Sequence, residues 1–201
     1  METRSGEMME LVKTEVEEKT FRPVNDEYRP FGFSICRELL HEHIEVPLVA
    51  RLFALPRRKR ILVVGCGAGS TLAKLAQFCR PQRLVGIDID ARSLKCAQTR
   101  LQRYRISAEL YQQDVRCTAF PEESFDAVID FGTGYHINRK VKALREVARL
   151  LVTGGLYVAE TRLAQRLAHP IRSRRQTLPL HLVPELRPHR FRLFWAAYEK
   201  V

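Results

Sequence analysis

Short apolar runs alternate with longer amphipathic stretches through the middle of the chain. The apolar runs predict strands over 61–64, 83–88, 109–112, 125–131 and 156–160. Apolar runs that do not alternate with polar residues are typical of strands that are buried on both faces, as in a parallel sheet. After 161 the periodicity is lost, and a final apolar run at 192–198 predicts one closing strand.

Helical patterns fill the gaps between these strands. Ser70 can begin one helix and Asp90 can cap a second, because their side chains accept hydrogen bonds from free N–H groups of a first turn. The apolar faces of these helices comprise Leu72, Leu75, Ala76, Cys79, Leu94, Ala97, Leu101 and Tyr104. A third helix is predicted over 138–151, and the glycine pair after it predicts a turn at 153–155. The alternation predicts an α/β fold with a doubly wound, mostly parallel sheet and helices on both faces.

Residues 1–55 differ from this pattern and precede a predicted domain at 56–201. They contain a polar arm, an aromatic-rich loop and a helix that Ser34 can cap and Pro47 would end or kink. The first twenty residues lack the apolar core of a signal peptide, and no apolar run approaches the length of a membrane span. Five cysteines without a CxxC pair are typical of reduced, mostly buried residues, so we expect a cytoplasmic protein.

The chain carries a formal charge of +11, from 34 basic and 23 acidic residues among 201. This excess is unevenly distributed. Residues 51–105 hold thirteen bases and two acids (net +11), and residues 162–201 hold nine bases and two acids (net +7). The bases of the first block fall on outer helix positions and say little about partners. The second block indicates an anionic acceptor or surface more than nucleic acid in particular.

A glycine-rich turn and three acids follow the predicted strands. The turn at 65–69, GCGAG, links the first strand to its helix, where backbone can approach a ligand closely and helix N–H groups are free. Asp88 ends the second strand, where a carboxylate can accept hydrogen bonds from ribose hydroxyls. Asp114 follows the third strand and Asp130 ends the fourth. All three carboxylates are therefore predicted at the carboxyl edge of the sheet.

In this order and spacing, the segments ILVVGCGAG, VGIDID, YQQDV, FDAVID and REVARLLVTGGLYVAE resemble the class I S-adenosylmethionine-dependent methyltransferases. The resemblance covers residues 60–161 and implies a Rossmann-like, seven-stranded sheet whose last strand is antiparallel. It also implies S-adenosylmethionine as cofactor and S-adenosylhomocysteine as product. It further places a set of residues around the cofactor, in order from the methionine half through ribose and adenine to the sulfonium. These are Gly65, Cys66, Gly67, Gly69, Asp88, Ile89, Asp114, Val115, Asp130 and Phe131.

One position departs from the family pattern. The family usually has an acid two residues before the first glycine, and this chain has Val63 there. The ammonium group of the cofactor then needs another partner, and Asp130 is the nearest candidate.

The loop that faces the acceptor in this family carries the candidate catalytic residues Tyr135 and His136. His136 is either a general base or substrate-orienting group, or a residue that only shapes the pocket. The segment at 130–137, DFGTGYHI, lacks the (Asp/Asn)-Pro-Pro-(Tyr/Phe) motif, which argues against transfer to a nucleobase amino group. Cys117 lies off the position of a cysteine nucleophile, and we interpret it as a packing residue.

Two flanking segments are predicted to complete the acceptor pocket. Tyr28 and Phe31 belong to the aromatic loop of the N-terminal unit, which we expect to cover the active site. His169 and Arg172 belong to a predicted substrate-side lid over 162–188. This lid could bind a carboxylate or phosphate on the acceptor. It could equally lie on a membrane surface, or be a solvated loop.

The leading hypothesis is therefore methyl transfer to a small-molecule acceptor that is anionic or lipid-like. An RNA methyltransferase is a second hypothesis, which the net charge favours but no base-specific motif supports. A cofactor-binding protein without activity is a third, with Val63 as its support. The sequence shows no metal-binding pattern, and it leaves the acceptor atom and the oligomeric state open.

Overall fold

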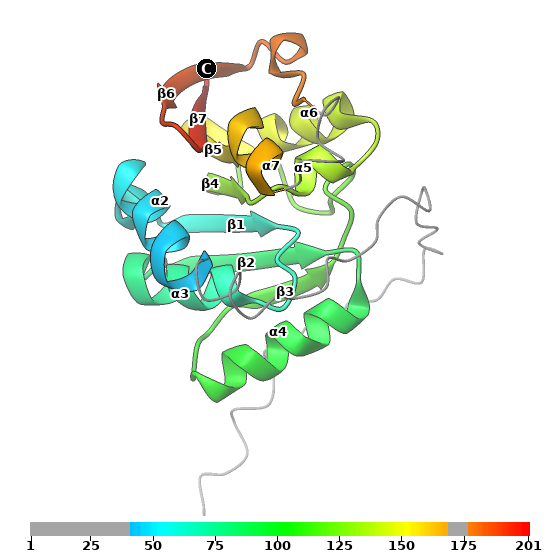
Figure 1. The fold of residues 1–201 in the computed structure, drawn as a ribbon. Coiled ribbons are helices and arrows are strands. Elements are labelled where there is room, and N and C mark those ends of the chain that lie inside the picture. Colours follow the sequence, from blue (N-terminus) through cyan, green and yellow to red (C-terminus); the bar gives the residue numbers. More distant parts are fainter. Residues whose placement is uncertain (1–40, 169–176) are drawn as a thin grey trace, which may run out of the picture.

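Seven strands form one sheet in the order β3-β2-β1-β4-β5-β7-β6 (Figure 1). The computed structural model describes residues 41–168 and 177–201. Strands β1 to β5 are parallel, and β7 lies antiparallel between β5 and β6. The strands are β1 (Arg60–Val64), β2 (Arg83–Asp88), β3 (Glu109–Gln112), β4 (Phe125–Asp130), β5 (Leu151–Glu160), β6 (Leu186–Phe191) and β7 (Trp195–Lys200).

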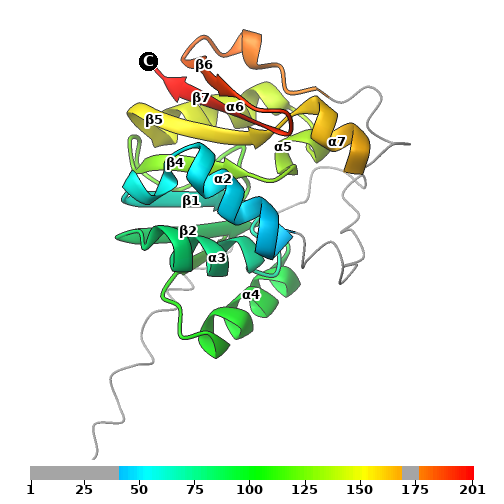
Figure 2. The same ribbon diagram turned by 60° about the vertical axis from the view of Figure 1, so that its left-hand side comes forward.

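Helices cover both faces of the sheet, so the predicted α/β class is confirmed (Figures 1 and 2). One face carries α2 (Val46–Leu52), α3 (Ser70–Cys79) and α4 (Ala91–Arg103), and the other carries α6 (Lys140–Leu150). Shorter helical elements lie at the strand ends and in the connections. These are η1 (His41–Glu45), η2 (Leu55–Arg57), α5 (Thr133–His136), α7 (Arg162–Ala168) and η4 (Leu180–Leu182).

The central strand β1 divides the core into two layers. Successive side chains of a strand point to opposite faces. Ile61 and Val63 accordingly pack into the cluster beneath α2 and α3, whereas Leu62 and Val64 pack into the cluster beneath α6. The four residues are 2% exposed or less, which explains why this segment reads as an unbroken apolar run.

The helix starts follow the sequence closely. The Asp90 side chain caps α4 by accepting hydrogen bonds from the N–H groups of Arg92 and Ser93, both at 3.2 Å. Pro47 lies in the first turn of α2, directly after the π-helical η1, so the type of helix changes where the sequence predicts an end or a kink. The expected helix cap at Ser34 lies outside the described residues.

The carboxyl-terminal part of the sheet differs from the prediction. A single strand was expected at 192–198, whereas β6 and β7 form a hairpin. Only Leu186 of β6 is buried and the strand contains Pro188, both typical of an edge strand that lacks an apolar pattern. Strand β5 begins at Leu151 instead of 156, because the expected turn at 153–155 is an irregularity within the strand.

Two expectations about burial are wrong. Tyr104 was predicted on the inner face of its helix, but it follows the last turn of α4 and is 52% exposed. Cys117 was interpreted as a packing residue, but it is exposed, as is Cys96, whereas Cys66 and Cys79 are buried. Within the described residues, no helix is long and apolar enough to cross a membrane.

We predict that Gly86→Ala destabilises the fold through a steric clash. A Cβ atom at this β2 position would lie 2.6 Å from Leu72 Cδ1 and 2.9 Å from Cys66 Sγ, and both side chains are buried. Overpacking of this kind costs about 1–3 kcal/mol of unfolding free energy, which urea denaturation would measure. Gly154→Ala is the comparison variant: its Cβ atom has room but its φ is +75°, so a loss of stability there reports backbone strain and not a clash. Equal stability of Gly86→Ala and the wild type would contradict the prediction.

Candidate functional site

The carboxyl ends of the central strands meet at one edge of the sheet. Val64 of β1 pairs with Ile87 of β2 and with Asp130 of β4, and Asp88 pairs with Gln112 of β3. The segments that follow these four strands are therefore neighbours. This is the edge at which open α/β sheets bind ligands.

The glycine turn after β1 requires its glycines for two different reasons. Gly65, Gly67 and Gly69 have φ values of +62°, +52° and +82°, in the region that L side chains rarely adopt. A Cβ atom at Gly65 would lie only 1.9 Å from Thr133 Oγ1, so the turn packs directly on the segment after β4. Within residues 41–168 and 177–201, no atom lies within 4 Å of a Cβ atom built at Gly67. Among the described residues, the backbone at Gly67 therefore faces open space that a ligand can enter.

Asp88 joins this turn to the end of β2. Its carboxylate accepts hydrogen bonds from the Gly67 N–H at 2.8 Å and the Asp90 N–H at 2.9 Å. Asp88 is buried, and burial raises the pKa of its carboxyl group although these hydrogen bonds lower it. Ile89 is half-buried, and its carbonyl oxygen accepts a hydrogen bond from Gln112 Nε2 at 3.1 Å.

Cys66 is a packing residue within the same turn. Its N–H group donates to the Ile87 carbonyl oxygen at 3.0 Å, and its side chain is 5% exposed. Burial raises the pKa of the thiol well above its usual range, so the thiol stays protonated at neutral pH.

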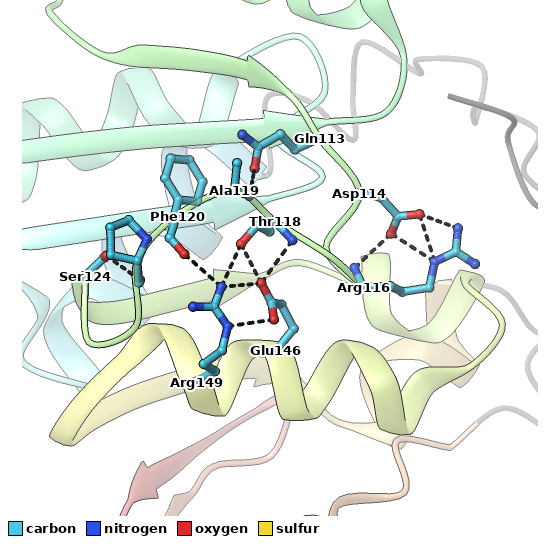
Figure 3. A network of polar contacts seen from close by, with 10 residues as sticks. Gln113, Asp114, Arg116, Thr118, Ala119, Phe120, Ser124, Glu146 and Arg149 are labelled. Atoms are coloured by element: carbon cyan, nitrogen blue, oxygen red, sulfur yellow. Dashed lines mark hydrogen bonds and ion pairs between the residues drawn. The ribbon is translucent and has the colours of Figure 1, made fainter. Parts of the chain in front are cut away.

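Asp114 is held by an arginine that the sequence reading did not single out (Figure 3). Arg116 donates from Nε to both carboxylate oxygens at 2.9 Å and from its backbone N–H to Oδ1 at 2.8 Å. The same guanidinium also donates to Asn138 Oδ1, beyond α5. Arg116 therefore links the segment after β3 to the segment after β4. Val115, between the two residues, is buried in the core layer beneath α6.

A second polar network fastens the β3–β4 connection to α6 (Figure 3). The Glu146 carboxylate accepts from the Thr118 N–H at 3.0 Å and the Thr118 hydroxyl at 2.6 Å. Arg149 donates to Glu146 at 2.6 Å and to the Phe120 carbonyl oxygen at 2.8 Å. These contacts fix the course of a loop that has no helix of its own.

Asp130 lies in the interior rather than at an open site. Its carboxylate accepts from the Tyr157 hydroxyl at 2.8 Å and the Gly134 N–H at 3.0 Å. Burial raises the pKa of this carboxyl group, against the effect of the hydrogen bonds. The adjoining cavity, of about 10 Å³, has room for one water molecule at most. Asp130 thus shapes the segment after β4, and its contacts do not support a role as the substitute for the acid missing at Val63.

The two candidate catalytic residues differ in their surroundings. Tyr135 is 4% exposed, and its hydroxyl donates to the Glu160 carbonyl oxygen at 3.0 Å. Its burial and this hydrogen bond within the fold indicate a structural role for Tyr135, and burial also raises the pKa of its hydroxyl. His136, at the end of α5, is only partly buried, and we retain it alone as the acceptor-side candidate.

The sequence and the fold both match known methyltransferases. Residues 61–155 match the family model described as a methyltransferase domain. The chain is 34% identical over 101 residues to a fatty-acid O-methyltransferase of Mycolicibacterium smegmatis, a match that covers 50% of this chain and 36% of that protein. It is 33% identical over 97 residues to a phthiotriol/phenolphthiotriol dimycocerosates methyltransferase of Mycobacterium leprae, covering 48% of this chain and 35% of that one.

Residues 61–155, just under half of the chain, are therefore similar to a methyltransferase domain. The crystal structure of a SAM dependent methyltransferase from Aquifex aeolicus has the same fold, with a TM-score of 0.63 over 85% of this chain and 100% of that one. Its sequence identity of 16% makes this a likeness of fold alone. The chain spans little more than a third of the two curated relatives, 36% and 35% of their lengths.

The candidate site also has neighbours from η1 that the sequence did not predict. His41, in η1, contacts Thr71 Oγ1 through Nε2 at 2.7 Å and Glu45 through Nδ1 at 2.8 Å. Its ring lies edge-on to Phe131, with centroids 4.6 Å apart. Glu42 forms an ion pair with Arg100 of α4. The segment before α2 is thus fixed beside the glycine turn, but a histidine in an amphipathic stretch carries no sequence signal for that contact.

Four candidate substrate residues lie outside the described residues: Tyr28, Phe31, His169 and Arg172. The predicted lid at 162–188 contains α7, η4 and the first residues of β6 within its described parts. In residues 41–168 and 177–201, no cluster of three or more histidine, cysteine, aspartate or glutamate side chains could hold a metal ion.

We predict that the stability difference between Asp130→Asn and the wild type depends on pH. Because the pKa of Asp130 is higher in the folded than in the unfolded chain, the folded state binds the proton more tightly. The wild type therefore loses stability as the pH rises from about 4 through the folded-state pKa, whereas an amide does not titrate. Relative to the wild type, Asp130→Asn should gain unfolding free energy over this interval.

Urea denaturation of both proteins at several pH values would measure this difference. Tyr157→Phe is the second variant, because it removes a donor that stabilises the ionised carboxylate. It should cost about 1–3 kcal/mol at neutral pH and less in acid. A difference between Asp130→Asn and the wild type that is constant with pH, or that falls as pH rises, would refute the argument.

Proposed function

We propose that this protein transfers a methyl group from S-adenosylmethionine to a small lipid-like acceptor. The observation that carries the cofactor assignment is the juxtaposition of open space at Gly67 with the Asp88 carboxylate on the neighbouring strand. The two relatives support the acceptor class, because one is a fatty-acid O-methyltransferase and the other a phthiotriol/phenolphthiotriol dimycocerosates methyltransferase. They also favour this acceptor over RNA, the alternative suggested by the net charge.

The residues present fit this cofactor. Main chain at 65–69 would border its methionine half, Asp88 its ribose hydroxyls and Ile89 one side of its adenine. Asp114 would accept from the adenine amino group, next to Val115. Because Arg116 already occupies both Asp114 oxygens, Arg116 sets the orientation of this acceptor. Phe131, partly buried against His41, would close the site from the β4 side.

The bound sulfonium supplies an activated methyl group, so the protein has little covalent chemistry to perform. Its residues position the two reactants in line and exclude water. A base is needed only where the acceptor must lose a proton in the reaction. A fatty-acid carboxylate is already ionised at neutral pH, whereas a lipid hydroxyl is not. The part played by His136 thus depends on which acceptor is used.

The cofactor assignment predicts that Asp88→Ala weakens binding of S-adenosylhomocysteine by about 10–100-fold, the value of hydrogen bonds to a charged group. Isothermal titration calorimetry would measure the affinity. Asp126→Ala is the matched control, because Asp126 is the second residue of β4, at the opposite edge of the sheet, where it accepts from the Arg60 N–H. Unaltered affinity in Asp88→Ala, or no binding by the folded wild type, would refute the assignment.

The acceptor assignment predicts different effects of His136→Gln on two acceptors. With a long-chain fatty acid, kcat and its pH profile should stay unchanged, because no proton is removed. With a long-chain alcohol, kcat should fall by about 100-fold or more, because a general base is lost. Assays of radiolabelled methyl transfer would measure both rates. If the wild type binds S-adenosylhomocysteine but methylates neither lipid, the acceptor class is wrong and the cofactor assignment stands. If His136→Gln has equal effects on both acceptors, His136 is not a base.

A further inference from the structure

The β6–β7 hairpin turn presents apolar side chains at the edge of the sheet that carries the candidate site. Arg192 N–H donates to the Trp195 carbonyl oxygen at 2.8 Å, which leaves Leu193 and Phe194 as a two-residue connection. Such connections usually consist of glycine, asparagine or aspartate. Leu193 is instead 67% exposed, the largest value among the exposed apolar side chains of the described residues.

The turn lies beside the start of α7 (Figure 2). Thr161, which follows β5, donates from its N–H to the Phe194 carbonyl oxygen at 2.8 Å and from its hydroxyl to the Leu193 carbonyl oxygen at 2.9 Å. Leu163, two residues further along, is 42% exposed, and Phe191 at the end of β6 is 57% exposed. Three exposed apolar side chains thus come from two adjoining segments, which differs from single apolar residues scattered over a surface.

Exposed arginines flank these apolar residues, whereas Glu160, the acid at the end of β5, is buried. Arg162, Arg190 and Arg192 are exposed in the same two segments. Residues 186–198 contain no acidic residue, and from 161 to 198 the sequence has Glu185 alone. Apolar tips between arginines match the two layers of an anionic membrane surface, where side chains enter the acyl boundary and cations remain at the headgroups. The charge complements neither a second copy of this basic face nor a neutral partner.

We propose that the β6–β7 turn and the start of α7 rest on the surface of an anionic lipid bilayer. The turn pairs with the end of β5, since Glu160 is opposite Trp195, so this surface adjoins the acceptor side of the carboxyl edge. A lipid-like acceptor could then pass from the bilayer to the site without crossing water. That consequence rests on the proposed function, whereas the membrane contact does not.

Vesicle flotation of the full chain tests the contact. The wild type should float with vesicles of phosphatidylcholine and phosphatidylglycerol in equal parts, and not with vesicles of phosphatidylcholine alone. A Phe191→Ser, Leu193→Ser double variant should lower the partition coefficient at least about tenfold. Arg192→Gln should lower it about fivefold, and added salt should weaken binding further.

Matched controls lie at the other edge of the sheet. Phe78→Ser changes a phenylalanine that is 43% exposed in the last turn of α3, and Arg103→Gln changes an exposed arginine in the last turn of α4. Both should float like the wild type. Thermal unfolding and S-adenosylhomocysteine binding should be unchanged in every variant, because the substituted residues are exposed and lie outside the proposed cofactor site.

Three outcomes would overturn the membrane contact. The first is that the wild type fails to float with anionic vesicles. The second is that the double variant floats as well as Phe78→Ser. The third is that sedimentation shows a wild-type dimer that the double variant abolishes, with no effect of vesicles. Because flotation is measured without cofactor or acceptor, its failure leaves the proposed function standing. A protein that floats but does not bind S-adenosylhomocysteine would refute the proposed function and leave the membrane contact standing.

Discussion

The geometry of the carboxyl edge depends on the hydrogen bonds that the buried Asp88 carboxylate accepts. Burying a charge is unfavourable unless hydrogen bonds compensate it, and Asp88 receives them from the N–H groups of Gly67 and Asp90. These donors belong to the turn after β1 and the turn after β2. One side chain thus holds two loops at a fixed separation, and both loops border the space at Gly67.

The remaining loops of this edge are fixed by different means. Steric contact joins Gly65 to Thr133, so the turn after β1 cannot move independently of the segment after β4. Arg116 joins Asp114 to Asn138 across the same edge. Asp130 and Tyr157 support the segment after β4 from the interior. The edge is therefore preorganised by contacts within the protein, which lowers the ordering cost of binding a ligand there.

The sequence predicted what periodicity and turn chemistry encode. The five parallel strands, the glycine turn and the cap at Asp90 were found because buried strands read as apolar runs and caps need particular side chains. Strand β6 was missed because an edge strand with exposed arginines and Pro188 has no apolar pattern. The interior position of Asp130 and the partner of Asp114 were missed for another reason. A sequence gives the position of a carboxylate along a strand, but not which side chain from another segment reaches it.

The basic carboxyl-terminal segment has a different meaning once its placement in the fold is known. Arg190 of β6 has a partner within the fold, since its guanidinium donates to the Leu52 carbonyl oxygen at 2.9 Å. Charge alone therefore distinguishes this segment poorly from the basic faces of α4. What distinguishes it is the conjunction of arginines with exposed Phe191 and Leu193 at a turn, where folding gains nothing from apolar residues. Such residues at the carboxyl edge are explained better by a ligand or surface outside the fold than by the packing of the fold itself.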